Sequence, residues 1–274
     1  MTIKLLAVDM DGTLLKSRNE MTPKVEQAVR QAIHKGIVVV IATGRVHASA
    51  GYYAKQLKTN APVISCNGAL IKKYNDSRAI RSYPIQKDRI AEVIDLIEAF
   101  HTMYYQVSTE NTYYFTKMNK GIEKYVEWNK TQKPEDRISI RPIEEFASRM
   151  DLQEVYKIYV SHENTRNNDL HRFLEEIENY DFIRQVRSME TSIDIIHHTV
   201  DKSKALEDVC EHLGISFNEV MAIGDQDNDV GMLKKAGLGV AMGNATDEAK
   251  KAADAVVGDN QSDGVAEAIE KYLL

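Results

Sequence analysis

The sequence predicts an α/β protein in which a doubly wound parallel sheet is interrupted by a smaller α+β domain. Near both ends of the chain, short apolar runs alternate with amphipathic helical segments. This pattern is typical of strands that are buried on both faces of a parallel sheet. Between them lie tyrosine-rich segments of the kind that pair locally beside helices. We therefore predict a sheet domain at residues 1–83 and 191–274 and an inserted domain at residues 84–190.

The composition is that of an ordinary globular protein. Of the 274 residues, 28% are charged and 43% are hydrophobic, and the formal net charge is -6. An acidic chain is not typical of nucleic-acid binders, which usually present a basic face. No apolar run approaches the ~18 residues that span a bilayer. We therefore expect neither a nucleic-acid nor a membrane partner, and the sequence leaves the oligomeric state open.

The N-terminal segment and the cysteines favour a cytoplasmic protein. Asp9 interrupts the first apolar run, so the segment lacks the pattern of a secretory signal. Cys66 and Cys210 occur in neither C-x-x-C nor zinc-site spacing. Both are expected to pack as small apolar residues.

The first half of the sheet domain has the order strand, helix, strand, helix, strand. Thr22 and Pro23 predict a helix start, because threonine caps the first turn and proline fits its first position. Apolar residues then recur at helical spacing until Gly36 ends the helix. The predicted strands are residues 3–8, 37–42 and 62–66, and the predicted helices are residues 23–35 and 46–57.

The insertion is predicted to contain a tyrosine-rich hairpin, further strands and helices. Its tyrosines are expected to pack as cross-strand aromatic pairs. A polar loop at residues 131–136 separates two groups of elements. The predicted strands are residues 103–107, 112–116, 155–160, 182–186 and 192–196, and the predicted helices are residues 85–101, 118–129 and 167–179.

The alternation of helices and buried strands then returns and completes the sheet domain. An amphipathic helix is closed by Gly214, a common residue after a helix end. The predicted strands are residues 220–223, 238–242 and 255–257, and the predicted helices are residues 202–213, 229–235, 246–253 and 264–274.

Two carboxylates follow the first predicted strand. Asp9 and Asp11 are spaced i, i+2, so an extended backbone directs both to the same side. Gly12 and Thr13 then form a turn whose N–H groups can face an anion. Carboxylates this close repel unless a cation lies between them, and Mg²⁺ suits few carboxylates with waters and phosphate oxygens. The alternative is a solvated acidic turn at a strand end.

Two further strand ends carry polar residues, and a parallel sheet brings such ends to one edge. Thr43 and Gly44 follow the second strand, and an acidic segment follows the strand at residues 220–223. Asp225 is expected to complete a magnesium site with Asp9. The segment fails as a calcium loop, because Val230 and Ala236 occupy the positions that require glycine and glutamate.

Two other patterns in this region receive structural interpretations. Asp227 is expected to cap the next helix, whereas Asp229 is expected to belong to the site. The glycines between residues 237 and 243 are one residue off a dinucleotide fingerprint, and a helix precedes them. We interpret them as turn glycines, because the fingerprint requires a strand before it and a helix after it.

Taken together, the motifs resemble those of the haloacid dehalogenase-like phosphatase superfamily, in particular its Cof-type branch. They occur in the family's order along the whole chain and are interrupted by an insertion. One departure is Ser203, where glycine often follows the motif lysine in this branch. The matching motifs are D-x-D-G-T at residues 9–13, A-T-G-R at 42–45, N-G-A at 67–69, Lys202, G-D-x-x-N-D at 224–229 and G-V-A-M-G-N-A at 239–245.

The resemblance implies a Rossmann-like core that acts as a magnesium-dependent phosphatase through an aspartyl-phosphate. It assigns catalysis to Asp9 as the nucleophile, Asp11 as the general acid and base, and Lys202. It implies an inserted cap that closes over the site and selects the substrate, a small phosphorylated metabolite such as a sugar phosphate. The implied substrate-binding residues are Thr43, Gly44, Arg45 and Asn228, and the implied metal-binding residues are Asp9, Asp11 (through its backbone carbonyl), Asp225 and Asp229.

Two other functions compete with this one. A phosphomutase would use the same chemistry but return the phosphoryl group to a sugar. A signalling domain would accept a phosphoryl group without turnover, but such a receiver needs no cap over its aspartate.

The sequence also offers two lysines at the start of one predicted helix. Lys202 and Lys204 point about 200° apart around that helix. The apolar face passes through Ala205 and Leu206, which lie three and four residues after Lys202. We therefore expect Lys202, and not Lys204, to face the edge of the sheet.

Overall fold

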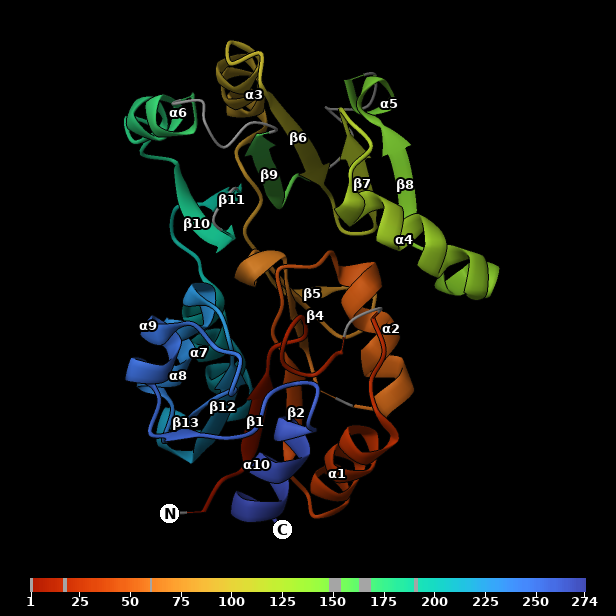
Figure 1. Ribbon diagram of the computed structural model, residues 1–274, viewed down its shortest axis with the longest axis vertical. Helices are drawn as coiled ribbons and strands as arrows, with labels where there is room; N and C mark the ends of the chain where they lie inside the picture. The colour runs from red at the N-terminus through yellow and green to blue at the C-terminus, as the bar shows by residue number, and fades with distance from the viewer. Residues whose placement is uncertain (1, 17–18, 60, 148–153, 163–168, 190–191) are drawn as a thin grey trace. The chain divides into compact units, whose positions relative to one another are not determined.

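The protein is described by a computed structural model that covers residues 2–16, 19–59, 61–147, 154–162, 169–189 and 192–274 (Figure 1). The chain divides into two compact units. The core unit comprises Met1–Ser82 and Asp201–Leu274, and the insertion unit comprises Tyr83–Val200. No helix within the described residues is long and apolar enough to cross a membrane.

The insertion unit extends beyond the predicted boundary at residue 190 to Val200. The reason is strand pairing. Strand β11 (Ser192–His197) pairs antiparallel with β10 (Ile183–Met189) and with β9 (Lys157–His162), and both partners belong to the insertion unit. Residues 192–200 therefore belong to the insertion unit and not to the sheet domain to which the sequence pattern assigned them.

The core unit is built on a five-stranded parallel sheet in the order β14-β13-β12-β1-β2. All of its central strand β1 is fully buried, as its uninterrupted apolar sequence predicts. The predicted doubly wound parallel sheet is thus confirmed. The strands are β1 (Leu5–Val8), β2 (Val38–Ile41), β12 (Val220–Gly224), β13 (Leu238–Ala241) and β14 (Ala255–Val256).

The strand order reverses at β1. The chain adds β2 on one side of β1, and after the insertion it adds β12, β13 and β14 on the other side. In open α/β sheets, ligands bind outside the carboxyl ends of the strands at such a reversal. The ends of β1 and β12 are therefore the place where this fold positions a site.

Strand β3 (Val63–Ser65) differs from the prediction. It is joined to β2 by one parallel bridge, between Ala42 and Ile64. Its ladder instead belongs to a small antiparallel sheet with β4 (Leu70–Lys72) and β5 (Ala79–Ser82), two strands that the sequence analysis did not predict. The turn at Cys66–Gly68 reverses the chain and pairs β4 with β3.

Two helices of the core unit, α1 and α7, begin or end at the cap residues that the sequence indicates. The Thr22 hydroxyl accepts a hydrogen bond from the Val25 amide, and Gly214 ends another helix with a left-handed backbone. Helix α8 packs beside β12 and β13, α9 packs beside β13, and α7 packs against α8 (Figure 1). The helices are α1 (Pro23–His34), α2 (His47–Leu57), α7 (Lys202–Leu213), α8 (Val230–Lys235), α9 (Asp247–Ala252) and α10 (Gly264–Tyr272).

The insertion unit contains a six-stranded mixed sheet in the order β10-β11-β9-β6-β7-β8. One face packs a hydrophobic core against helices, with Ile158 and Ile195 among its fully buried residues. Strand β8 and helix α5 were not predicted, and residues 167 and 168 of a predicted helix lie outside the described residues. The remaining elements are β6 (Met103–Ser108), β7 (Thr112–Phe115), β8 (Ser139–Pro142), α3 (Ile90–Glu98), α4 (Lys120–Thr131), α5 (Ile143–Ala147) and α6 (Asp169–Ile177).

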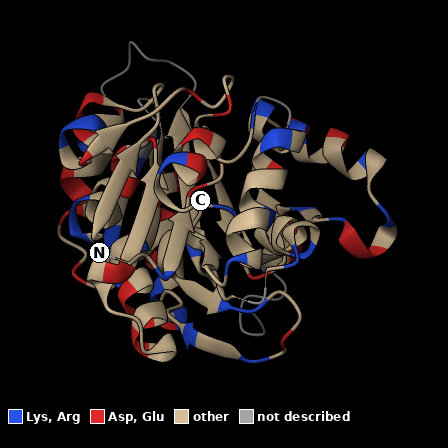
Figure 2. Cartoon of the chain, turned by 90° about the horizontal axis from the view of Figure 1, so that it is seen from below, with Lys and Arg blue, Asp and Glu red and all other residues tan. Residues whose placement is uncertain are grey.

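Charged side chains of both signs are interspersed over the helices and loops. Figure 2 shows the central strands largely free of them. The excess of acidic residues that gives the net charge of -6 is therefore spread over several elements.

The contact between α7 and α8 explains how Ser203 is accommodated. Ser203 is buried on α7, and a Cβ atom added to Gly231 of α8 would lie 2.9 Å from the Ser203 Cβ atom. The missing side chain at position 231 therefore provides the space that the serine occupies.

We predict that Gly231→Ala destabilises the protein by about 1–3 kcal/mol, because it overpacks this contact. In a Ser203→Gly background the same change should stabilise it by roughly 0.5–1 kcal/mol, the usual gain of alanine over glycine in a helix. Thermal unfolding of the four proteins measures both effects. The same sign in both backgrounds would contradict this packing account.

Candidate active site

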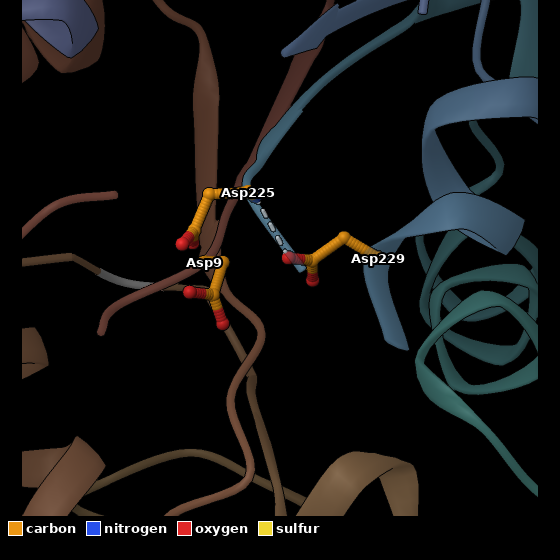
Figure 3. A group of neighbouring side chains, drawn as sticks. All are labelled: Asp9, Asp225 and Asp229. Carbon is orange, nitrogen blue, oxygen red and sulfur yellow. Dashed lines mark hydrogen bonds between the residues drawn. The ribbon is translucent and has the colours of Figure 1, made fainter. Parts of the chain in front are cut away.

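Three acidic side chains meet where β1 and β12 end. Asp9 follows β1, Asp225 follows β12, and Asp229 lies in the turn before α8. Each offers a carboxylate oxygen, and these oxygens lie within 4.8 Å of one another (Figure 3). All three residues are buried. We call this group the acidic cluster.

Lys202 brings a positive charge into the acidic cluster. It is the first residue of α7, and its side chain is 1% exposed. Its Nζ lies 2.5 Å from Asp9 Oδ1 and 2.7 Å from Asp229 Oδ1. Burial alone would lower the pKa of Lys202, but Asp229 and Asp9 outweigh that effect and raise it. Lys202 therefore carries its charge inside the site.

Asp229 is held by the protein through both of its oxygens. Oδ1 accepts from Lys202, and Oδ2 accepts from the backbone amides of Asp225 and Gln226, each at 3.0 Å. A Cβ atom at Gly224 would lie 2.6 Å from the Asp229 Cβ atom, so the close approach requires glycine there. Asp229 is therefore placed to orient Lys202 and the loop that carries Asp225.

Asp225 is oriented by the turn that follows β1. Thr13 donates its hydroxyl to Asp225 Oδ1 at 2.7 Å, and Gln226 Nε2 donates to Oδ2 at 3.0 Å. Gly12 has a φ of +85°, and a Cβ atom on it would lie 2.3 Å from Asp225 Oδ2. Glycine is needed at position 12 both for this backbone conformation and for this approach.

The site holds three carboxyl groups, those of the acidic cluster, and one ammonium group, that of Lys202. Burial raises the pKa of Asp9 well above its usual range, although Lys202 opposes this, and burial with the nearby Asp229 raises the pKa of Asp225 to about 6. Burial disfavours the ionised form of these carboxyl groups, and a bound cation would stabilise that form. Oxygen ligands of this kind suit Mg²⁺, so the three residues of the acidic cluster fit the expected metal.

The loop after β2 is fixed by the left-handed turn at Cys66–Gly68. The amide of Cys66 donates to the Arg45 carbonyl at 2.8 Å, and the amide of Asn67 donates to the Thr43 carbonyl at 3.0 Å. Both Cys66 and Asn67 have positive φ angles, which are uncommon outside glycine. The Thr43 hydroxyl accepts from the Arg45 amide at 3.2 Å, so its own hydrogen can point to a ligand.

Asn228 is linked to this loop through Asn67. Its Nδ2 donates to Asn67 Oδ1 at 3.0 Å, whereas its Oδ1 is buried without a hydrogen-bond partner among the described residues. The Asn67 side chain also lies against Gly44, at 3.0 Å from where a Cβ atom there would be. Thr43, Gly44 and Asn228 are thus neighbours at one edge of the sheet.

The Asp11 side chain does not belong to the acidic cluster. It forms a two-pronged ion pair with Arg45, whose Nε donates to Asp11 Oδ2 at 2.7 Å and whose second terminal nitrogen donates to Asp11 Oδ1. Arg45 is buried, whereas the Asp11 side chain is 62% exposed. The arginine that was expected to bind substrate thus contacts the expected general acid.

Two residues that the sequence analysis excluded lie away from the acidic cluster. Lys204 is half-exposed, and its Nζ pairs with the buried Asp208, four residues further along α7, at 2.7 Å. Asp227 is exposed and accepts a hydrogen bond from the Thr246 hydroxyl at 2.8 Å. Asp227 thus stabilises the start of α9 rather than capping α8.

The side chains of three further residues contribute to the site, although the sequence motifs that contain them did not predict these side-chain contacts. Thr13 orients Asp225, and Asn67 links two loops. Asn244 Nδ2 donates to the Gly12 carbonyl at 2.9 Å and lies 3.4 Å from Asp225 Oδ2. Two signals in the sequence point to these residues: each lies in a motif, and each is a polar residue that follows a strand end.

The chain is similar to known proteins along nearly its whole length. A family model described as haloacid dehalogenase-like hydrolase matches residues 6–269. The chain is 28% identical to the pyridoxal phosphate phosphatase YbhA of Escherichia coli, with 100% of each protein covered. It is 33% identical to the 5-amino-6-(5-phospho-D-ribitylamino)uracil phosphatase YcsE of Bacillus subtilis, over 99% of this chain and 96% of that protein.

A solved structure shows the same architecture. A haloacid dehalogenase-like hydrolase from B. subtilis matches with a TM-score of 0.85 and 30% identity, over 99% of this chain and 100% of that one. The match therefore includes both the parallel sheet and the insertion.

We predict that Asp225→Asn stabilises the metal-free protein at neutral pH. The pKa of Asp225 is about 6 in the folded protein and ~3.9 in an unfolded chain. As the pH rises through this window, the unfolded state loses its proton first, so the wild type loses stability. The loss amounts to at most about 3 kcal/mol above that window, and asparagine removes it.

Thermal unfolding between about pH 3.5 and about pH 8, a range that extends beyond both pKa values, checks this prediction. The stability of the variant relative to the wild type should increase as the pH rises, and Mg²⁺ should stabilise the wild type more than the variant. Asp227→Asn is the matched control, because Asp227 is exposed and outside the acidic cluster. A gain that is independent of pH, or equal in the control, would contradict the prediction.

Proposed function

Because the chain belongs to the haloacid dehalogenase-like hydrolase family and is a phosphoric monoester hydrolase, we propose that it is a magnesium-dependent phosphatase that forms a phosphorylated Asp9. The observation that carries this proposal is the pairing of Asp9 with the buried Lys202 beside Asp225, where the strand order reverses. Phosphoryl transfer depends mostly on positioning and on neutralising charge. A buried carboxylate with an ammonium and a metal-binding partner supplies both.

In the proposed reaction, a carboxylate oxygen of Asp9 attacks phosphorus, and the bond from phosphorus to the leaving oxygen breaks. Asp11, which enters the reaction in its protonated form, gives that proton to the leaving oxygen, which departs as an alcohol. Asp11 then takes a proton from water as the water oxygen attacks phosphorus, and the bond between phosphorus and Asp9 breaks. The products are the alcohol and inorganic phosphate, and both aspartates return to their starting forms.

Further residues would hold the transferring group. Thr43, Lys202 and Asn228 would donate hydrogen bonds or charge to the phosphoryl oxygens. Asp9, Asp225 and the Asp11 carbonyl would hold Mg²⁺, with Asp229 orienting the loop. When bound, the ion would offset the negative charge of phosphate and carboxylates. Hydrolysis of phosphate monoesters can require acceleration of up to ~10²¹-fold, of which general acid catalysis supplies roughly 10² to 10⁴.

The proposed substrates are small phosphorylated metabolites, sugar phosphates among them. The relatives YbhA and YcsE are named as phosphatases of pyridoxal phosphate and of a phosphorylated ribitylaminouracil. Both substrates are phosphate esters of small organic alcohols. We propose that the insertion unit selects among such substrates, since the proposed phosphoryl-binding groups all lie in the core unit.

The experiment is a screen of phosphorylated metabolites, including sugar phosphates and pyridoxal phosphate, in which inorganic phosphate release is measured with and without Mg²⁺. We predict steady release that requires the metal. Lys202→Ala should lower turnover by at least about 10²-fold, because an ammonium ~4 Å from a phosphoryl charge interacts by roughly 4 kcal/mol at an effective dielectric of ~20. Lys204→Ala should change turnover little, because Lys204 pairs with Asp208 and not with the acidic cluster.

Two results would reject this assignment. One is a larger loss from Lys204→Ala than from Lys202→Ala. The other is transfer of the phosphoryl group between positions of a sugar without net phosphate release, which would indicate a phosphomutase.

A further inference from the structure

We propose that Arg45 is a positioning residue for Asp11 and not a ligand of the phosphoryl group. The proposal rests on the proposed function, in which Asp11 exchanges a proton with the leaving oxygen and with water. Arg45 would set where the Asp11 carboxyl group lies, and it would act on the substrate only through Asp11.

The donors of Arg45 are engaged by the protein. Nε and one terminal nitrogen donate to the two oxygens of Asp11. The same terminal nitrogen donates to Asn19 Oδ1 at 2.6 Å, and the other terminal nitrogen donates to Ser49 Oγ at 3.4 Å. Each guanidinium nitrogen thus has a protein acceptor. A phosphate ligand would instead need donors that face the substrate.

Arg45 is also fixed along its whole length. Its carbonyl accepts from the Cys66 amide at 2.8 Å, and its guanidinium carbon lies 5.7 Å from the centroid of the Tyr53 ring. The Tyr53 hydroxyl donates to the Asn19 carbonyl at 2.7 Å, and this holds the residue whose side chain contacts Arg45. Only 5% of the Arg45 side chain is exposed.

Asp11, in contrast, extends into solvent and receives its orientation from Arg45. Its side chain is 62% exposed and lies in the turn after β1. A planar guanidinium that contacts both carboxylate oxygens fixes the orientation of the carboxyl group as well as its position. Such positioning matters for an acid and base, because a small misplacement of a reacting group can cost about 10²-fold in rate.

The test compares two substrates that differ in their need for an acid. An aryl phosphate has a good leaving group, whereas an alkyl phosphate requires protonation of its leaving oxygen. In Arg45→Met, we expect the single-turnover rate of alcohol release from the alkyl phosphate to fall at least about 10²-fold. The rate with the aryl phosphate should fall much less. KM for both substrates and inhibition by inorganic phosphate should stay within about threefold of the wild-type values.

Further variants test whether Arg45 acts through Asp11. Asp11→Asn should show the same dependence on the leaving group, and adding Arg45→Met to it should cause little further loss. Arg45→Lys keeps the charge without the two-pronged contact, so it should recover only part of the alkyl phosphate rate. It also serves as the folded test protein if Arg45→Met is unstable. Arg30→Met is the control, since Arg30 pairs with Glu26 on α1, outside the site.

Several outcomes overturn the proposal. A raised KM and weaker inhibition by inorganic phosphate, with equal losses for both substrates, would make Arg45 a phosphate ligand. Additive losses in the double variant would mean that Arg45 does not act through Asp11. A wild-type protein that hydrolyses neither substrate with Mg²⁺ would reject the proposed function and this inference together, before any variant is compared.

Discussion

The core unit must keep the charged groups of Lys202, Asp9 and Asp229 buried where the strand order reverses, and the rest of its structure depends on this constraint. Lys202 and its two carboxylate partners are almost completely removed from water. Burying an ion costs several kcal/mol unless its partners and hydrogen bonds compensate for the lost hydration. The surrounding residues supply this compensation, through the backbone amides that contact Asp229 and the threonine that contacts Asp225. The glycines at positions 12 and 224 allow the necessary close approach.

The site forms although a long insertion separates its residues in the sequence. Asp9 lies before the insertion unit and Lys202 directly after it. The parallel pairing of β1 with β12 brings the two segments together, independently of how many residues intervene. The cost of closing a loop grows only slowly with its length. Variation in the insertion therefore need not disturb the acidic cluster.

The sequence was most informative for the strands that are buried on both faces, because an uninterrupted apolar run between helices indicates a parallel strand. The apolar runs before Asp9 and Asp225 predicted parallel strands, and parallel strands bring these carboxylates together. Short strands such as β4 and β5 were missed, because a strand of three or four residues has too few alternations to show a pattern. The pairing of Arg45 with Asp11 could not be predicted, because several acceptors compete for a guanidinium and only their distances decide the partner.

The central claim is that Asp9 carries the phosphoryl group during turnover, and the most direct test is to capture it there. A reaction with excess enzyme and Mg²⁺ would be quenched in acid, digested and examined by peptide mass spectrometry. The account predicts one phosphoryl group on Asp9, and none in an Asp9→Asn variant that folds normally but is inactive. A phosphoryl group on another residue, or normal turnover by Asp9→Asn, would contradict it.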